Sequence, residues 1–269
     1  MEKVPIFILG ISQRSGTTYL SHLLRLHPEC ESASPIREDY LLDHAGFLFE
    51  YARSVYRSWA PKWGVSEPLR EELVAHLGKG LLSFMSARAG DKRLLTKTPS
   101  VQNLELFFRL FPGAKLLILV RDGRAVVESY VRSGGLTYEQ ATERWVGGAR
   151  TILDFLQREE SGNCDYLVVK YEDLYLRLND ELERILSFLG LDKTVYDFSA
   201  ARNLPVRGSS SFRGSTTEKV HWQPIEKTAD FNPLERWRGW DKERLARFNK
   251  VAGELMKGLG YEIETATSV

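Results

Sequence analysis

The feature that most constrains the fold is an apolar run that leads into a polar turn and then into a helical pattern. Val4–Gly10 is continuously apolar, as expected for a strand buried on both faces of a parallel sheet. A polar turn follows at 11–16, and Thr17–His27 then carries apolar residues at helical spacing. Such a turn is suited to binding an anion, because free backbone N–H groups and the positive end of the helix dipole point into it.

The spacing of this turn differs from that of the triphosphate-binding loop G-x-x-x-x-G-K-[ST]. Gly10 and Gly16 are one residue too far apart, and Thr17 stands where that motif requires Lys. Arg14 supplies a positive charge instead, in a planar fork suited to bidentate contacts with an oxyanion. Taken alone, the segment can also be interpreted as an ordinary polar turn.

Strand and helix patterns alternate along the rest of the chain. Further strands are expected at Arg93–Thr98, Ala114–Val120 and Asp165–Lys170. This alternation predicts an α/β fold of three layers, in which helices flank a mainly parallel central sheet. The expected helices cover residues 39–59, 68–88, 100–111, 123–132, 138–160, 180–189 and 241–259.

No repeat or domain boundary interrupts this pattern, so we expect a single domain over residues 1–269. Within it, residues 39–90 form a helical segment that we expect on the acceptor side, and residues 200–235 form a long loop over the site. The net charge of +1 argues against nucleic acid or an anionic membrane as a partner. No segment approaches the ~20 apolar residues of a membrane helix. Because the chain has only 2 cysteines and no visible signal peptide, we expect a cytoplasmic protein, the alternative being a fragment of a luminal one.

Cationic side chains follow two of the expected strands. Lys97 lies at the end of one strand and Arg121 directly after another, at the sheet edge where ligands of such folds bind. Ser129 is placed to share an anion with Arg121, although a surface Arg and a helix-face Ser are an equally plain interpretation. Two anion sites without His, Cys, Asp or Glu at metal-ligand spacing indicate a nucleotide phosphorylated at both ends and no metal.

Together these segments resemble the sulfotransferases that use 3′-phosphoadenosine 5′-phosphosulfate (PAPS). The loop 13–18 is similar to the family's 5′-phosphosulfate loop, and Arg121 with Ser129 to its 3′-phosphate signature. Tyr171-Glu172-Asp173-Leu174 resembles the Y-E-D-L segment whose Tyr lies by the adenine. The resemblance implies a P-loop NTPase-like sulfotransferase fold, PAPS as donor and adenosine 3′,5′-bisphosphate as product. The donor-binding residues that it implies are Gln13, Arg14, Ser15, Gly16, Thr17, Thr18, Tyr19, Arg121, Ser129, Tyr171, Arg207, Gly208 and Ser209.

The implied general base differs from that of the family's small-molecule cytosolic branch. That branch uses a His after K-T, whereas Thr98-Pro99 follows Lys97 here. Arg37-Glu38-Asp39-Tyr40-Leu41-Leu42 is instead similar to the [KR]-E-x-x-F-F segment of the carbohydrate-directed branch. The resemblance therefore implies Glu38 as base and Arg14 and Lys97 as catalytic cations; Asp39 and Glu31 are the alternative bases.

The expected reaction is transfer of a sulfuryl group from PAPS to a hydroxyl or amine by in-line displacement. A small-molecule, carbohydrate or lipid acceptor would fit the aromatic residues between 40 and 63 about equally well. A P-loop kinase is the second hypothesis, but it would require a Lys after Gly16 and an acid at position 121. A non-catalytic nucleotide-binding module is the third.

Overall fold

The computed structural model describes residues 3–133, 135–158, 165–205 and 232–263. Its centre is a sheet of 5 strands in the order β2-β3-β1-β4-β5, and every neighbouring pair is parallel. All residues of β1 are buried, because it lies in the middle of the sheet and helices cover both of its faces. The strands are β1 (Ile6–Gly10), β2 (Cys30–Ser32), β3 (Arg93–Thr98), β4 (Lys115–Val120) and β5 (Tyr166–Lys170).

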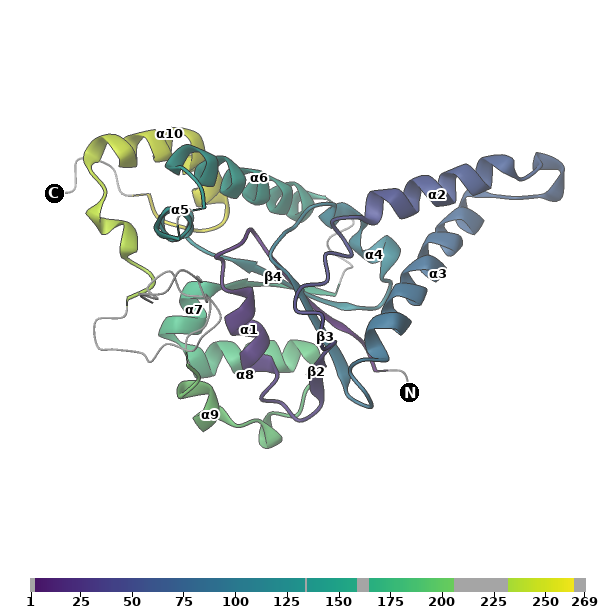
Figure 1. Cartoon of the computed structure of the whole chain (residues 1–269), viewed down its shortest axis with the longest axis horizontal. Coiled ribbons are helices and arrows are strands. Elements are labelled where there is room, and N and C mark those ends of the chain that lie inside the picture. The colour runs from purple at the N-terminus through teal and green to yellow at the C-terminus, as the bar shows by residue number, and fades with distance from the viewer. Residues whose placement is uncertain (1–2, 134, 159–164, 206–231, 264–269) are drawn as a thin grey trace.

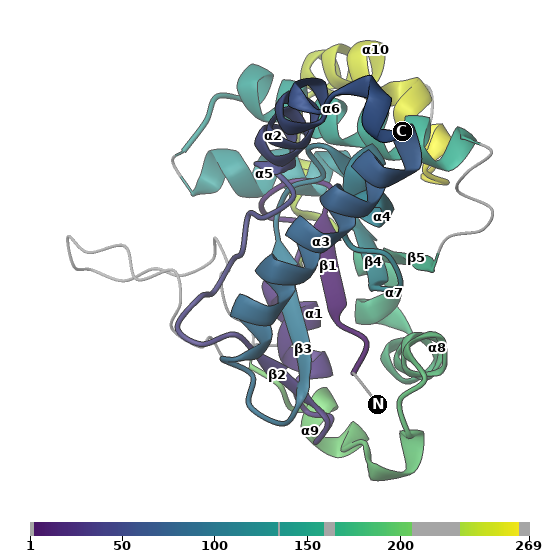
Figure 2. The ribbon, with the colours of Figure 1, turned by 90° about the vertical axis from the view of Figure 1, so that its right-hand side faces the viewer.

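Alternate side chains of β1 enter two separate cores. Phe7 and Leu9 pack with the helices on one face, and Ile6 and Ile8 with those on the other. Figures 1 and 2 show these two helical layers with the sheet between them, which confirms the three-layer prediction. The first face carries α2 (Ala45–Ser58), α3 (Glu67–Ser86), α4 (Phe107–Leu110), α5 (Gly123–Arg132), α6 (Tyr138–Gln157) and α10 (Lys242–Gly258). The second carries α1 (Thr17–Leu24), α7 (Tyr171–Leu176), α8 (Leu178–Leu189) and α9 (Phe198–Arg202).

Helices α2 and α3 form an antiparallel pair that extends away from the sheet (Figure 1). Short 3₁₀ helices complete the described structure: η1 (Pro61–Trp63), which joins this pair, η2 (Leu104–Leu106), η4 (Lys193–Val195) and η5 (Arg236–Gly239). Every helix of the described part of the chain is too short or too polar to cross a bilayer.

The helices expected at 39–59 and 100–111 are wrong at their N-terminal ends. Tyr40 has φ 50° and Asn103 has φ 59°, and this left-handed backbone interrupts each helix. The first therefore begins only at Ala45, and the second divides into η2 and α4. Residues 39–40 instead lie against β3, where the Asp39 N–H donates to the Lys97 carbonyl at 3.2 Å.

Candidate active site

The turn after β1 depends on glycine at two positions. A Cβ on Gly10 would lie 2.4 Å from the Ser15 Oγ, and one on Gly16 would lie 2.4 Å from the Tyr171 ring. Gly16 also has φ 105°, a conformation that L side chains rarely adopt. Helix α1 begins at Thr17 with no side-chain cap and no acidic residue in its first turn. In the described part of the chain, no side-chain cap occupies its first backbone N–H groups, and an uncapped helix N-terminus is suited to an anion.

Arg14, Arg121 and Ser129, predicted from distant segments, form one cluster. The Arg14 Nε donates to the Ser129 Oγ at 3.1 Å, and the Arg121 Nη1 donates to the Arg14 carbonyl at 2.8 Å. The Arg121 Nη2 donates to the Pro233 carbonyl at 2.7 Å, and its guanidinium lies 4.2 Å from the centre of the Tyr171 ring. The turn after β1 and the end of β4 therefore make a single cationic surface, which we call the donor cluster.

The donor cluster holds buried positive charge that lacks a full set of partners. The Arg14 Nη2 and the Arg121 Nε are buried and have no hydrogen-bond partner in the described part of the chain. Burial and the nearby Arg121 lower the pKa of Arg14. Burial, followed by Arg121, also lowers the pKa of Arg236 to about 10. An anion placed among these guanidinium groups would supply the missing partners and relieve their mutual repulsion.

Arg236 is a member of this cluster that sequence reasoning missed as a site residue. It belongs to η5, more than 100 positions from Arg121 in the sequence, and no local motif marks it. The one signal that could have found it is that the resemblance to the sulfotransferases extends to its segment, Arg236-Trp237-Arg238. Its proximity to Arg121 follows from tertiary packing, since η5 contacts α5.

A hydrogen-bonded frame fixes the backbone at the end of β4. The Trp145 indole donates to the Arg121 carbonyl at 3.1 Å, and the Asp122 N–H donates to the Glu172 Oε1 at 2.9 Å. The Tyr261 hydroxyl donates to the Glu172 Oε2 at 3.0 Å. Glu172 of the Y-E-D-L segment therefore has a structural role, because it joins α7 and the C-terminal residues to the strand end that presents Arg121.

Glu38 and Lys97 form a second cluster, at the end of β3. The Lys97 Nζ donates to the Glu38 Oε1 at 2.9 Å, and the Tyr40 hydroxyl donates to the Glu38 Oε2 at 2.6 Å. The side chain of Lys97 is 8% exposed and that of Glu38 is 22% exposed, so a ligand can reach the carboxylate. Burial and the hydrogen bond to Glu38 raise the pKa of Tyr40 to about 12, so its hydroxyl stays a donor at neutral pH. We call these three residues the base cluster.

The two alternative acids already have structural partners. The Asp39 Oδ2 accepts a hydrogen bond from the Thr96 hydroxyl at 2.6 Å, and its Oδ1 accepts one from the Leu41 N–H at 2.9 Å. Glu31 pairs with Arg25 at 2.9 Å on the surface. Of the three candidate bases, Glu38 is the one that contacts Lys97.

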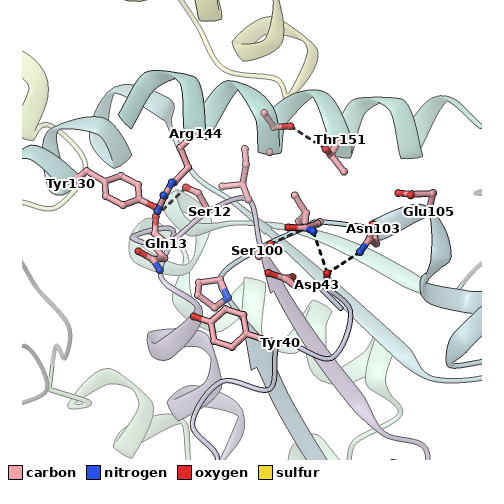
Figure 3. A pocket seen from close by; sticks show the side chains of 16 residues that line it. Ser12, Gln13, Tyr40, Asp43, Ser100, Asn103, Glu105, Tyr130, Arg144 and Thr151 are labelled. Atoms are coloured by element: carbon pink, nitrogen blue, oxygen red, sulfur yellow. Dashed lines mark hydrogen bonds between the residues drawn. The ribbon is translucent and has the colours of Figure 1, made fainter. Parts of the chain in front are cut away.

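The other predicted residues lie around the two clusters or outside the described residues. Arg14 joins the donor cluster and Lys97 joins the base cluster, so the two predicted catalytic cations belong to different clusters. Tyr19 lies edge-on to Tyr171, with 6.2 Å between ring centres. Thr18 and Lys97 line a cavity of about 490 Å³ beside α1, and Gln13 lines another of about 630 Å³ on the α6 side (Figure 3). Arg207, Gly208 and Ser209 lie outside the described residues.

Acidic and metal-binding side chains are not gathered at either cluster. In residues 3–133, 135–158, 165–205 and 232–263, no group of 3 or more His, Cys, Asp or Glu side chains is placed to hold a metal ion. The arrangement is instead a group of largely buried cations at the same sheet edge as a carboxylate–ammonium pair. It suits an anionic ligand and a reaction in which a proton is removed.

Comparison with known proteins identifies similar chains. A family model described as "Sulfotransferase family" matches residues 5–195. Protein-tyrosine sulfotransferase A of Caenorhabditis elegans is 25% identical over 96% of this chain and 67% of its own length. Protein-tyrosine sulfotransferase of Drosophila melanogaster is 27% identical over 97% and 52%, and nodulation protein NoeE of Sinorhizobium fredii is 26% identical over 95% and 65%. The chain thus spans between about half and two thirds of the length of these relatives.

Solved structures show the same architecture. The sulfotransferase domain of the olefin synthase from Synechococcus PCC 7002 superposes with a TM-score of 0.61 at 25% identity, covering 98% of both chains. Mouse sulfotransferase SULT7A1, solved as a complex with PAP, covers 96% of this chain and 85% of its own with a TM-score of 0.52. At 15% identity, that second likeness concerns the fold alone. The predicted sulfotransferase fold is confirmed.

Proposed function

The chain belongs to the sulfotransferase family, and we propose that it transfers a sulfuryl group from PAPS to a hydroxyl or amine of its acceptor. The observation that carries this proposal is the pairing of two clusters at the same edge of the sheet. One holds buried guanidinium nitrogens without partners, and the other holds a carboxylate within reach of solvent. The first suits a phosphorylated donor, and the second suits an acceptor that must lose a proton.

The residues present fit a nucleotide with phosphate groups at both ends. Arg121, Ser129 and Arg236 would hold the 3′-phosphate, because they collect buried positive charge and hydrogen-bond donors. Arg14 contacts Ser129 and would lie between that phosphate and the 5′-phosphate loop to which it belongs, where it would act with Lys97 on the leaving oxygen. The α1 N-terminus and the hydroxyls of Thr17 and Thr18 would hold the 5′-phosphate. Contacts from the 207–209 segment remain part of this proposal. When bound, PAPS supplies the sulfuryl group and a phosphate leaving group.

The base cluster would handle the acceptor. Glu38 would take the proton from the acceptor hydroxyl as the acceptor oxygen bonds to sulfur and the bond from sulfur to the 5′-phosphate oxygen breaks. Lys97 and Tyr40 hold the two carboxylate oxygens in place, which orients them for that proton. Lys97 would also stabilise the negative charge that develops on the leaving oxygen.

The acceptor class and the location of the protein are separate proposals. Relatives are named protein-tyrosine sulfotransferases, so a tyrosyl hydroxyl is one candidate acceptor, beside a small-molecule, carbohydrate or lipid hydroxyl. We also propose a cytoplasmic location, because 2 cysteines are too few for a disulfide framework.

Calorimetric titration with adenosine 3′,5′-bisphosphate, AMP and ATP, each with and without Mg²⁺, tests the donor assignment. We expect the bisphosphate to bind without metal and AMP to bind at least ~10-fold more weakly, because AMP lacks the phosphate for the buried guanidinium groups. A preference for ATP with Mg²⁺ would overturn the proposal in favour of a kinase. Bisphosphate binding with no transfer to any acceptor in a broad screen would favour a non-catalytic module.

A further inference from the structure

One face of helix α5 holds the short segment that carries Arg236. The residues of this face follow one another at intervals of four positions, so they lie on the same side of the helix. Each of them contacts η5 or Trp240, the residue directly after η5. We call this set the α5 face; it consists of Arg124, Glu128 and Arg132.

Glu128 is the centre of the α5 face, and both of its carboxylate oxygens have partners. Its Oε2 accepts from the Trp240 indole at 2.7 Å and from the Tyr138 hydroxyl at 2.9 Å. Its Oε1 accepts from the Arg132 Nε at 2.6 Å. The side chain is only 8% exposed, and burial alone would raise the pKa of Glu128. The three hydrogen bonds outweigh burial and lower that pKa, so Glu128 is a carboxylate at neutral pH.

The other two members of the α5 face hold η5 at two further points. The Arg124 guanidinium lies 3.8 Å from the centre of the Trp237 ring, and Trp237 is itself buried. The Arg132 Nη2 donates to the carbonyl of Arg236 at 3.3 Å. Arg236 is therefore held through its own backbone and through the residue that follows it in the chain.

Arg236 needs this support because the charges around it repel it. Burial, followed by the charge of Arg121, lowers the pKa of Arg236 to about 10. The charges of Arg132 and Arg14 act in the same direction. Arg132 is paired with Glu128, which reduces its repulsion of Arg236. If Glu128 lost its charge, Arg132 would repel Arg236 with its full charge.

We propose that Glu128 is a positioning residue for the 3′-phosphate, which holds η5 so that Arg236 lies in the donor cluster before the nucleotide binds. This inference rests on the proposed function, because it takes Arg236 as a ligand of that phosphate. Glu128 acts in two ways: it fixes Trp240 through the indole, and it neutralises Arg132. Since α5 also carries Ser129, one helix then positions phosphate ligands from two distant segments of the chain.

Calorimetric titration of Glu128→Gln with adenosine 3′,5′-bisphosphate and with AMP tests this inference. The amide is uncharged, and its nitrogen cannot accept a hydrogen bond, so the side chain can no longer serve all three donors. We expect bisphosphate affinity to fall about 10-fold and AMP affinity to stay within a factor of about 2, since AMP lacks the phosphate that Arg236 would contact. The ratio of the two affinities is decisive, because a loss of folded protein affects both nucleotides alike.

Glu181→Gln is the matched control, on the opposite face of the sheet. Glu181 of α8 is also a buried glutamate, 6% exposed, and it pairs with Arg184 on the next turn of its helix. Its substitution should lower the melting temperature about as much as Glu128→Gln and leave the affinity ratio unchanged. Trp240→Phe removes only the indole N–H and should lower the ratio about 3-fold, so it tests the inference even if Glu128→Gln does not fold.

Combination with Arg236→Ala separates positioning from a direct effect on the nucleotide. If Glu128 acts through Arg236, Glu128→Gln should not lower the ratio further in the Arg236→Ala background. A further fall in that background would overturn the inference, as would an equal fall in Glu181→Gln. An unchanged ratio in folded Glu128→Gln, or in Trp240→Phe if that variant alone folds, would also overturn it. A wild-type protein that binds the bisphosphate no better than AMP would instead overturn the proposed function.

Discussion

The donor cluster and the base cluster lie at the same edge of one sheet, yet they balance their charges in different ways. Arg14 and Arg121 donate to neutral acceptors, namely the Ser129 hydroxyl and the carbonyls of Arg14 and Pro233. Lys97 is paired with Glu38 at 2.9 Å. A site with uncompensated cations favours a ligand that is permanently anionic. A site with a matched pair suits a group whose charge changes during the reaction.

The supports of the two clusters differ as well. The end of β4 is held from below by Trp145 and Glu172, and Asp122 caps the following helix by accepting from the Arg124 N–H. Glu38 instead lies in the loop before α2. Its support from within that loop is the hydrogen bond from the hydroxyl of Tyr40. We therefore expect changes at the donor cluster to act on affinity, and changes at the base cluster to act on turnover.

The largest expected effect is on turnover, from Glu38→Gln. The amide cannot accept the acceptor proton, so we expect kcat to fall by ~10²–10⁴, the usual range for loss of a general base. Affinity for adenosine 3′,5′-bisphosphate, measured by calorimetry, should stay within a factor of about 3 because no donor contact is removed. Glu31→Gln is the control and should keep full activity. If Glu31→Gln loses activity and Glu38→Gln keeps it, Glu31 is the base. The base cluster of Glu38, Lys97 and Tyr40 would then have no role in proton removal.

The next effect is on affinity, from Arg121→Ala. Removal of a partly unpartnered buried guanidinium should weaken bisphosphate binding about 100-fold, consistent with the 2–5 kcal/mol typical of a lost buried charge contact. Arg121 also donates to the carbonyls of Arg14 and Pro233, so thermal melting should accompany the titration. Arg247→Ala removes a guanidinium that is 64% exposed and should change neither quantity. Wild-type affinity in a folded Arg121→Ala variant would contradict the 3′-phosphate assignment.

Sequence reasoning recovered the parts of the donor cluster that are local. The turn from Gly10 to Thr18 is contiguous, and Ser129 lies on the helix that begins two residues after Arg121. One strand and the helix after it were therefore enough to predict each pair. The sequence predicted that Arg14 and Ser129 lie at the same edge of the sheet. It did not predict their hydrogen bond, because 115 positions separate the two residues. Arg236 has no such local pattern and needed the tertiary structure.

The loop that carries Glu38 shows why the acceptor side was harder to predict. Helical spacing continues through 39–44, but Tyr40 takes φ 50° because its N–H donates to the Thr98 Oγ1 at 3.0 Å and its hydroxyl donates to Glu38. Those contacts are tertiary and override local propensity. Strand β2 was also missed, because its 3 residues are too short to show a period.

A smaller effect on turnover is expected from Tyr40→Phe. This change removes the 2.6 Å hydrogen bond that orients the Glu38 carboxylate and leaves the Lys97 contact in place. We expect kcat to fall by about 10-fold, close to the 0.5–1.5 kcal/mol of one hydrogen bond, with unchanged bisphosphate affinity. Tyr51→Phe on α2, 56% exposed, is the matched control. A loss of bisphosphate affinity in Tyr40→Phe would show that the two clusters do not act separately.

The smallest expected effect is on stability and concerns Glu172, beneath the donor cluster. Burial raises the pKa of Glu172 in the folded protein, although its hydrogen bond from the Asp122 N–H opposes the shift. The unfolded chain ionises at the ordinary Glu pKa of about 4.3, so the favourable contribution of this carboxyl to folding is complete below that pH and is lost as pH rises through the folded pKa. Glu172→Gln cannot ionise and escapes that loss.

The melting temperature of wild type minus that of Glu172→Gln should therefore be larger at pH 4.5 than at pH 7.5. Glu254→Gln, at a side chain that is 88% exposed, should show a much smaller change between the two pH values. A constant difference for Glu172→Gln would mean that burial does not oppose ionisation there. Burial of Glu172 would then cost no stability at neutral pH, and the two clusters would differ only in how their charges are paired. A falling difference would mean that Glu172 sacrifices some stability at neutral pH while it holds the strand end that presents Arg121.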